Sequence, residues 1–287
     1  MGRFAPSPTG DLHLGSLYAA AASYLDARAH GGRWLIRLED LDRPRERPGA
    51  AARILRTLEA FGFEWDGEVV RQSDRGPLYA AALDALRRAG RTFECSCSRL
   101  DLADAPRYPG SCRSGPLRRG RPTAVRLRVE PGIVRFTDRI QGPGARDVAA
   151  TAGDLVIRRR DGIVSYLLAV VVDDAAQGVT DVVRGADLIE HTPAQRHLQE
   201  LLGLPAPRYA HVPVLTEPDG AKLAKSARSL ALDAREPQGP LLRALDLLGL
   251  PVGEQPLPAG LPEIWDWAIR RWDPERVPKR PALPVRG

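Results

Sequence analysis

Residues 2–42 read GRFAPSPTGDLHLGSLYAAAASYLDARAHGGRWLIRLEDLD and hold two strand-like segments on either side of one helical segment. The segment GRFAPSP predicts a short strand that runs into a proline-rich turn. The alanine-rich run SLYAAAASYLDARAH predicts a helix that ends at Gly31 and Gly32. The segment RWLIRLEDLD predicts a strand that ends in acidic residues, and amphipathic helices are expected over 50–61 and 78–89. This alternation favours a parallel sheet covered by helices, with ligands at the carboxyl ends of the strands.

Residues 92–122 interrupt the alternation with a stretch rich in Cys, Pro, Gly and Arg that has no clear hydrophobic period, and we interpret it as an inserted subdomain. The alternating architecture is expected to resume after it. Helices are predicted over 193–202 and 241–248, and an amphipathic segment over 262–272 precedes a proline-rich tail. Strand-like runs are TAVRLRV (123–129), IVRFTDRI (133–140), DLVIRRRDG (154–162), the apolar SYLLAVVVDD (165–174) and VTDVVRGADLI (179–189).

The bulk composition limits the class of protein. A chain of 287 residues can bury a sizeable core in one large domain with one or two insertions. It contains no run of about eighteen apolar residues, and its first residues lack the layout of a secretion signal. We therefore expect a soluble cytoplasmic protein without a membrane partner. Three cysteines, two of them at 95 and 97, suit metal binding or reduced thiols better than a disulfide framework.

The basic charge is unevenly distributed. The net charge is +6, yet residues 98–160 alone contain fourteen arginines and six acidic residues. Such a segment fits a phosphate backbone, and it equally fits a solvated arginine-rich face. Only three basic residues are lysines, and Lys222 and Lys225 share the stretch AKLAKS, which indicates that a flexible ammonium group is needed there.

The sequence HLGS at 13–16 lies where a helix follows a strand. Backbone N–H groups at a helix start attract anions, Gly15 permits close approach, and His13 can donate a hydrogen bond. A phosphate site is one interpretation of this tetrapeptide. A capping or surface histidine is the other, and the tetrapeptide alone does not separate them.

Two stretches together resemble a known family. APSPTGDLHLGS (5–16) is similar to the HIGH motif of class I aminoacyl-tRNA synthetases, and KLAKS (222–226) is similar to their KMSKS loop. Between them lie RLEDLDRPRE (37–46), VVVDDAAQGVTDVVRGADLI (170–189) and HVPVL (211–215), which narrow the resemblance to the glutamyl and glutaminyl branch. The resemblance spans residues 2–226. Ala224 stands where the family has a serine, which puts loop closure in question.

The resemblance implies an α/β fold of the class I synthetase type, a Rossmann-like doubly wound parallel sheet with an inserted zinc-binding subdomain and a short helical C-terminal part. In the domain arrangement that we expect, residues 1–91 form the first half of the catalytic domain and 92–122 the zinc-binding insert. Residues 123–215 then form an acceptor-type insert and the second half, and 216–287 the KMSKS-like loop and the helical end, without an anticodon-binding domain.

The resemblance also implies a reaction and its residues. Glutamate is activated with ATP and Mg²⁺ to the adenylate, which requires positioning and charge neutralisation without a protein nucleophile. His13 and Lys225 are the expected catalytic residues, and the expected ATP-binding residues are His13, Gly15, Ser16, Lys222 and Lys225. Glutamate, with two carboxylates and one ammonium, calls for arginines and a carboxylate, and its expected ligands are Arg3, Ser7, Glu39, Tyr166 and Arg184.

The three cysteines allow two interpretations from the residues alone. Three thiolates with a fourth oxygen ligand can bind Zn²⁺, whereas buried free thiols account for them equally well. The arrangement Cys-X-Cys, then Tyr, X3 and Cys, resembles the zinc site of one subfamily, the glutamyl-Q tRNA(Asp) synthetases. That resemblance implies a structural zinc held by Cys95, Cys97, Tyr108 and Cys112.

Only 61 residues follow Ser226, which we interpret as too few for an anticodon-binding domain. The resemblance is therefore to the short members of the family, which activate glutamate without tRNA and attach it to queuosine at the wobble position of tRNA(Asp). We expect a monomer whose partners are that tRNA, glutamate and ATP. Two alternatives stay open at this point: a small-molecule adenylyltransferase of the same superfamily, and an inactive RNA-binding zinc module.

Overall fold

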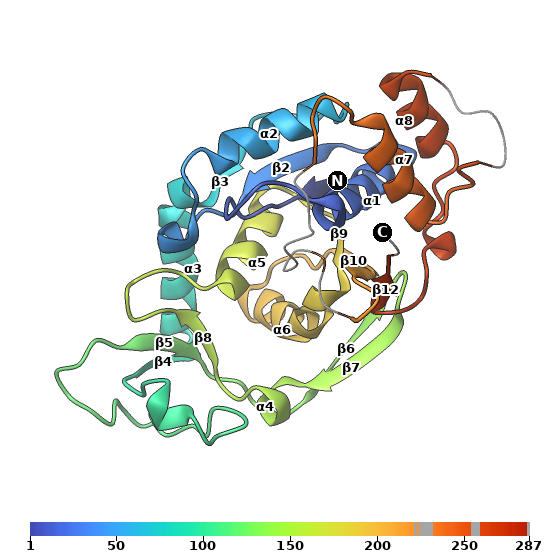
Figure 1. Cartoon of the computed structure of the whole chain (residues 1–287). Coiled ribbons are helices and arrows are strands. Elements are labelled where there is room, and N and C mark those ends of the chain that lie inside the picture. The colour runs from blue at the N-terminus through green and yellow to red at the C-terminus, as the bar shows by residue number, and fades with distance from the viewer. Residues whose placement is uncertain (221–222, 224–231, 254–258, 286–287) are drawn as a thin grey trace.

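Figure 1 shows the chain as a computed structural model that describes residues 1–220, 223, 232–253 and 259–285. The helices are α1 (Leu14–Ala29), α2 (Ala50–Ala60), α3 (Gly76–Arg88), α4 (Val148–Thr151), α5 (Tyr166–Ala176), α6 (Thr192–Leu202), α7 (Gln238–Leu247) and α8 (Leu261–Ile269). The strands are β1 (Gly2–Phe4), β2 (Trp34–Leu38), β3 (Val70–Arg71), β4 (Thr92–Cys95), β5 (Ala124–Leu127), β6 (Ile133–Asp138), β7 (Gly142–Asp147), β8 (Leu155–Arg158), β9 (Asp181–Gly185), β10 (Arg208–Val212), β11 (Val214–Thr216) and β12 (Ala282–Pro284).

Parallel strands form the centre of the molecule. β2 pairs in parallel with β1 and with β3, and β10 pairs in parallel with β9 and with β6. The two sets meet where the Met1 carbonyl accepts hydrogen bonds from the N–H groups of Thr180 and Asp181, at 3.0 and 3.1 Å. The expectation of an α/β fold with a parallel sheet is confirmed.

Helix α1 is buried over most of its length because alanines make up much of its surface. Residues Leu17, Tyr18 and Ala20–Ala27 are buried between β1, β9 and α7. Small side chains let the helix approach the sheet closely, and a helix that is apolar on most sides is typical of a core position. The position of its N-terminus is therefore fixed relative to the strand ends.

The prediction that the apolar run SYLLAVVVDD forms a strand is wrong. The run forms helix α5, whose N-terminus is capped by the Ser165 hydroxyl, which accepts a hydrogen bond from Leu168 N at 3.4 Å. Residues 167–174 are all buried, against α3, α6 and β8. Burial on every side removes the amphipathic period, so a buried helix and a buried strand look alike in sequence.

The sequence did not predict two antiparallel pairings of strands. Residues 92–95, which show no clear period, form β4 in an antiparallel sheet with β5 and β8. The segment GPGARD forms β7, which pairs antiparallel with β6, although glycine and proline disfavour strands. Figure 1 shows the β4–β5–β8 sheet and the cysteine-bearing insert at the end of the molecule remote from α7 and α8.

The C-terminal part packs onto α1 and β2 through an aromatic cluster. The Trp265 ring on α8 lies 4.8 Å from the Tyr24 ring and 4.7 Å from the Phe63 ring, and its indole N–H donates to the Phe61 carbonyl at 2.9 Å. Gly62 adopts φ +74° against this indole, where a Cβ would lie 3.2 Å from Nε1. Among the helices within the described ranges, none is long and apolar enough to cross a membrane.

We predict that Trp265→Ala lowers the free energy of unfolding by about 3–5 kcal/mol, because it leaves a cavity in the aromatic cluster. Trp265→Phe keeps a ring but leaves the Phe61 carbonyl without its donor, and should cost about 1–3 kcal/mol. Urea unfolding followed by circular dichroism measures both. The control Leu78→Ala alters a side chain that is 42% exposed and should stay within about 0.5 kcal/mol of the parent protein; equal effects of all three variants would contradict the assignment.

Candidate active site and cysteine cluster

The N-terminus of α1 is capped by His13. Its Nδ1 atom accepts a hydrogen bond from Gly15 N at 3.1 Å, while the Ser16 hydroxyl accepts one from His13 N at 2.7 Å. A Cβ on residue 15 would lie 3.1 Å from the imidazole, so glycine suits this turn. Because Nδ1 is an acceptor, the neutral ring carries its proton on Nε2.

A cavity of about 210 Å³ adjoins this helix start. His13, Gly15 and Ser16 line it together with Asp187 and the segment 212–215, which includes most of the HVPVL motif. Asp187 and the wall formed by Val212–Leu215 were missed as site residues, although both lie within motifs that the sequence analysis singled out. Lys222 and Lys225, with Ala224 and Ser226, lie outside the described residues.

The residues predicted to hold glutamate come from the ends of different strands. Arg3 is in β1, Glu39 directly follows β2, and Arg184 is in β9, while Tyr166 is the first residue of α5. The structure brings several of them together. Arg184 Nη1 donates to the Tyr166 hydroxyl at 3.4 Å, and Ser7 and Glu39 line one cavity of about 170 Å³. Glu39 and Arg3 also lie close enough to Tyr166 to influence its pKa, which burial raises.

A buried ion-pair network lies beneath these residues and was not anticipated. The Arg37 side chain is 0% exposed, and its Nη1 donates to Asp174 Oδ1 and to Gln177 Oε1, both at 2.8 Å. Arg3 Nε reaches the same Asp174 oxygen at 3.3 Å. Arg37 Nη2 lies 3.6 Å from Glu39 Oε1, as expected for positions i and i+2 on one face of a strand.

Asp173 anchors a second branch of this network. Its carboxylate lies 2.5 Å from Arg75 Nε and 2.8 Å from both Gln72 Nε2 and the Tyr79 hydroxyl. The branch ties α5 to the segment that leads into α3. The only sequence signal for either branch is the pair of acidic residues inside an apolar run, since buried acids require partners.

The two carboxyl groups nearest Arg37 respond differently to burial. Burial raises the pKa of Glu39 from its ordinary value, and the nearby Arg37 and Arg3 only partly oppose this. For Asp174, burial acts in the same direction, but Arg37 and Arg3 outweigh it and hold its pKa below the usual range. Of these two carboxyl groups, Glu39 is the one that would gain more from a further cationic partner.

Arg184 is held by more groups than the sequence analysis identified. Its Nη2 donates to Gln195 Oε1 at 2.7 Å and to Thr192 Oγ1 at 3.1 Å, and its Nε donates to His211 Nε2 at 2.9 Å. His211 belongs to the HVPVL motif, so a signal for it was present. Gln195 and Thr192 lie in α6, outside every motif that we identified.

The three cysteines lie together in the insert. Their sulfur atoms are all within 4.8 Å of one another, with Cys97 Sγ and Cys112 Sγ 3.5 Å apart. The Tyr108 hydroxyl lies 3.5 Å from Cys95 Sγ and accepts a hydrogen bond from Cys112 N at 2.9 Å. Gly153, at φ +70°, passes so close to Tyr108 that a Cβ would lie 2.4 Å from its carbonyl oxygen.

The chemistry of this cluster suits a divalent metal ion. Burial acts to raise the pKa of the Cys112 thiol, but hydrogen bonds from the backbone N–H groups of Leu117 and Ser96 lower it to about 6. Burial, and then hydrogen bonding to Cys112, raises the pKa of Cys97 to about 12. One thiol thus ionises readily and its neighbour resists, as adjacent like charges require. A cation between them would offset that repulsion, so the cluster could bind a metal such as Zn²⁺.

Most arginines of the basic segment 98–160 are used within the fold. Six of the fourteen form ion pairs with carboxylates, as Arg113 does with Asp154 at 2.7 Å. Four more donate to backbone carbonyl oxygens. The remaining four are exposed and have no polar partner among the residues that the structure describes: Arg99, Arg119, Arg121 and Arg135.

These features define an α/β protein whose predicted ligand residues lie mostly in or directly after parallel strands, where ligands bind in such folds. A family described as tRNA synthetases class I (E and Q), catalytic domain, matches residues 1–256. The chain therefore belongs to this family, and it is a ligase of the aminoacyl-tRNA synthetase type.

Curated relatives match over nearly the whole chain. Glutamyl-Q tRNA(Asp) synthetase of Pseudomonas paraeruginosa is 54% identical over 285 residues, covering 99% of this chain and 97% of the relative. The protein of the same name from Thiobacillus denitrificans is 51% identical over 290 residues, covering 99% and 96%. Among solved structures, glutamate-tRNA synthetase of Elizabethkingia anophelis superposes with a TM-score of 0.82 at 25% identity, covering 98% of this chain and 67% of that protein.

We predict that Arg37→Met lowers the free energy of unfolding by about 3–5 kcal/mol near neutral pH, because it leaves buried carboxylates without their cation. In the parent protein the folded-state pKa of Asp174 lies below its unfolded value, so its contribution is lost only as the pH falls through that lowered pKa. In the variant, the buried carboxyl groups should have a higher pKa in the folded state than in the unfolded state, so the folded state should bind protons more tightly. The deficit should therefore shrink from about pH 8 to about pH 5.

Urea unfolding at several pH values measures this difference. Arg53→Met is the matched control, because Arg53 pairs with Asp11 at 2.6 Å in a largely exposed position. Its cost should stay below about 1 kcal/mol at every pH. A deficit for Arg37→Met that grows with acidity would contradict the role assigned to this arginine.

Proposed function

We propose that this chain activates glutamate with ATP to glutamyl-adenylate in the absence of tRNA, and then transfers the glutamate to queuosine at the wobble position of tRNA(Asp). The observation that carries the proposal is the relatives' shared name together with identity of 51–54% over 99% of the chain. In this proposal residues 1–91 and 123–215 bind the small substrates, and residues 92–122 hold zinc. Residues 216–287 add the KMSKS-like loop and the helical end, and the enzyme acts as a cytoplasmic monomer.

The types of charged group near the buried network suit glutamate as the substrate. Arg3 and Arg184 can face its two carboxylates, and Glu39 can face its ammonium. Its ammonium is assigned to Glu39, whose raised pKa reflects incomplete compensation. Its carboxylates are assigned to Arg184 and Arg3, with Tyr166 and Ser7 beside them.

The cavity at the start of α1 supports ATP as the second substrate. In the proposed site His13, Gly15 and Ser16 hold the nucleotide, and Lys222 and Lys225 reach its phosphates, which Mg²⁺ accompanies. Helix N–H groups and the Nε2 proton of His13 favour a polyanion there. The glutamate carboxylate displaces pyrophosphate from the α-phosphate, and the chain's contribution is orientation and charge neutralisation.

The second step is acyl transfer from the mixed anhydride to a hydroxyl group of queuosine, with AMP as the leaving group and no covalent enzyme intermediate. A base in a single-stranded anticodon loop can be splayed out at modest cost. The surface proposed to hold the anticodon arm is the insert, where Arg99, Arg119 and Arg121 are exposed without partners among the described residues. Exposed Leu100 directly follows Arg99, and exposed Leu117 lies two residues before Arg119; both offer apolar area to bases.

The insert is proposed to hold one structural Zn²⁺ through Cys95, Cys97, Tyr108 and Cys112. The proximity of the three sulfur atoms and of the Tyr108 hydroxyl supports this ligand set. A bound ion would fix the insert around its otherwise irregular loop, which places the exposed arginines relative to the catalytic site.

The test of the proposed function is incubation with labelled glutamate, ATP and tRNA(Asp) that carries or lacks queuosine. Label should appear on the queuosine nucleoside and should be absent when the tRNA has guanosine at that position. Pyrophosphate exchange should proceed with glutamate and ATP alone. Label on the 3′-terminal adenosine would sink the proposal, and exchange supported only by another carboxylic acid would favour the small-molecule adenylyltransferase.

Purified protein should contain one zinc ion per chain by mass spectrometry, and Cys97→Ser should lose it, because removing one of three thiolates leaves too few strong ligands. Tyr108→Phe should release zinc to a mild chelator faster than the parent protein does. Ser111→Ala changes an exposed neighbour of Cys112 and serves as the control with full zinc content. Full zinc content in Cys97→Ser would contradict the proposed site and would mean that the cysteines are free thiols.

A further inference from the structure

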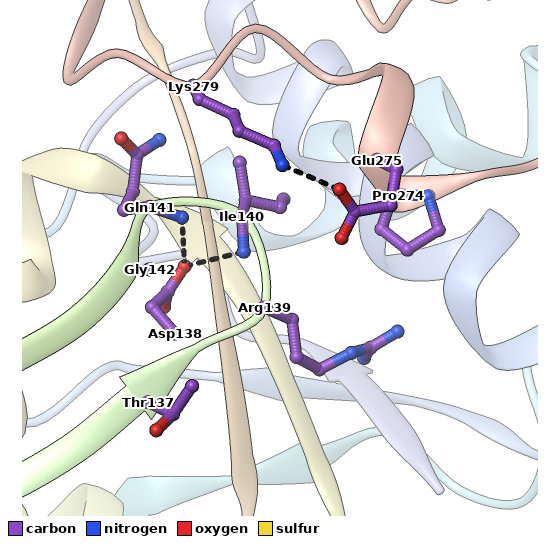
Figure 2. A pocket seen from close by; sticks show the side chains of 9 residues that line it. All are labelled: Thr137, Asp138, Arg139, Ile140, Gln141, Gly142, Pro274, Glu275 and Lys279. Carbon is purple, nitrogen blue, oxygen red and sulfur yellow. Dashed lines mark hydrogen bonds and ion pairs between the residues drawn. The ribbon is translucent and has the colours of Figure 1, made fainter.

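Asp138 is held rigidly at the end of β6. Figure 2 shows its carboxylate accepting from the backbone N–H groups of Ile140 and Gln141, at 3.0 and 2.9 Å, beside a cavity of about 400 Å³. The same oxygen, Oδ1, also accepts from His211 N at 3.0 Å. Three backbone donors therefore fix Oδ1, and the second oxygen, Oδ2, is left for a side-chain partner.

That partner is the His211 imidazole. Its Nδ1 lies 2.5 Å from Asp138 Oδ2, and both side chains are 0% exposed. A carboxylate only accepts, so Nδ1 must carry a proton. On the other side of the ring, Nε2 lies 2.9 Å from Arg184 Nε, and a guanidinium only donates. Both neighbours thus require the neutral Nδ1–H tautomer.

The contacts of Arg184 determine which of its donors is left for a ligand. Nε is used by His211, and Nη2 donates to Gln195, Thr192 and the Leu188 carbonyl at 2.7–3.3 Å. Nη1 has two hydrogens and one contact in the described part of the chain, the Tyr166 hydroxyl at 3.4 Å. Because the guanidinium is planar, fixing Nε and Nη2 also fixes the direction of Nη1.

We propose that Asp138 and His211 are positioning residues for glutamate, which they orient through the Arg184 guanidinium by holding His211 in its Nδ1–H tautomer. The inference rests on the proposed function, in which Arg184 binds a carboxylate of glutamate. Neither positioning residue touches the substrate. Asp138 selects the tautomer, His211 offers the acceptor, and Arg184 directs Nη1 to the carboxylate.

The substitution Asp138→Asn tests this series of hydrogen bonds with little change in side-chain shape. The three backbone N–H groups require an oxygen at the Oδ1 position, so the new NH2 group must face His211 Nδ1. His211 then has to accept at Nδ1 and carry its proton on Nε2. That proton would face the Arg184 Nε–H, and the two donors would repel each other.

We predict that Asp138→Asn raises the KM for glutamate in pyrophosphate exchange by about tenfold or more, the range for losing a hydrogen bond to a charged group. The KM for ATP should change by less than about twofold on the same scale. Asp26→Asn is the matched control, because Asp26 is also a buried aspartate, held by Arg139, without contact to His211. Equal changes in both KM values, or an unchanged KM for glutamate in folded Asp138→Asn, would overturn the inference.

A pair of His211 variants separates positioning from packing. His211→Gln places an oxygen where it can accept from Arg184 Nε, whereas His211→Leu fills similar space without an acceptor. Both lose the contact with Asp138. Glutamate KM should stay within about threefold of the parent value in His211→Gln and rise by about tenfold in His211→Leu. Equal KM values in the two variants would mean that His211 acts through packing alone.

A spectroscopic measurement distinguishes failure of the inference from failure of the proposed function. Nitrogen-15 spectra of the histidine rings should show His211 protonated at Nδ1 in the parent protein and at Nε2 in Asp138→Asn. An Nε2–H ring in the parent protein would end the inference whatever the substrate is. Correct tautomers without glutamate-dependent exchange would instead mean that the proposed function is wrong, and with it the role in glutamate binding.

Discussion

The ion pair between Arg37 and Asp174 is the constraint on which the rest of the site depends. It is buried, and it joins β2 to α5, while Asp174 also binds Arg3 of β1. A buried charge without its partner is costly, so arrangements that separate these three elements are disfavoured. Glu39 follows Arg37 by two residues and takes its position from the same strand. The carboxyl ends of the strands are thus aligned before any ligand arrives.

The same logic explains why arginine, and not lysine, builds this site. Arg184 contacts groups from three elements through three nitrogens: α5 at Nη1, α6 at Nη2 and β10 at Nε. A lysine ammonium cannot present donors in a fixed plane to three partners. Only three lysines occur in the chain, two of them in AKLAKS. Planar cations thus serve where geometry must be fixed, whereas two of the three flexible cations lie in the KMSKS-like segment that is proposed to reach the phosphates of ATP.

The sequence predicted the parallel sheet and the helix start near His13, because these follow from local patterns of glycine, proline and apolar residues. The site residues came from the resemblance to a family and stay a prediction. The sequence did not predict the partners. Arg37 and Asp174 are 137 residues apart in the sequence, and Asp138 and His211 are 73 residues apart. No local period links residues at such separations. The apolar run of α5 was misassigned for a related reason, since burial on all sides removes the period that distinguishes helix from strand.

Charge counting over 98–160 illustrates a further limit of composition. The fourteen arginines fitted a phosphate-binding surface and a solvated face equally well, yet ten of them bind carboxylates or carbonyl oxygens within the fold. An arginine that already pairs with a carboxylate adds little field at the surface, and recruiting it to phosphate would require breaking that pair. An arginine that donates only to a carbonyl oxygen keeps its charge, so the field available to a polyanion comes from the four arginines of this kind and from the four exposed arginines without partners. Three of the latter lie between residues 99 and 121. That concentration, rather than the total charge, favours the cysteine-bearing insert as the surface that a tRNA would meet.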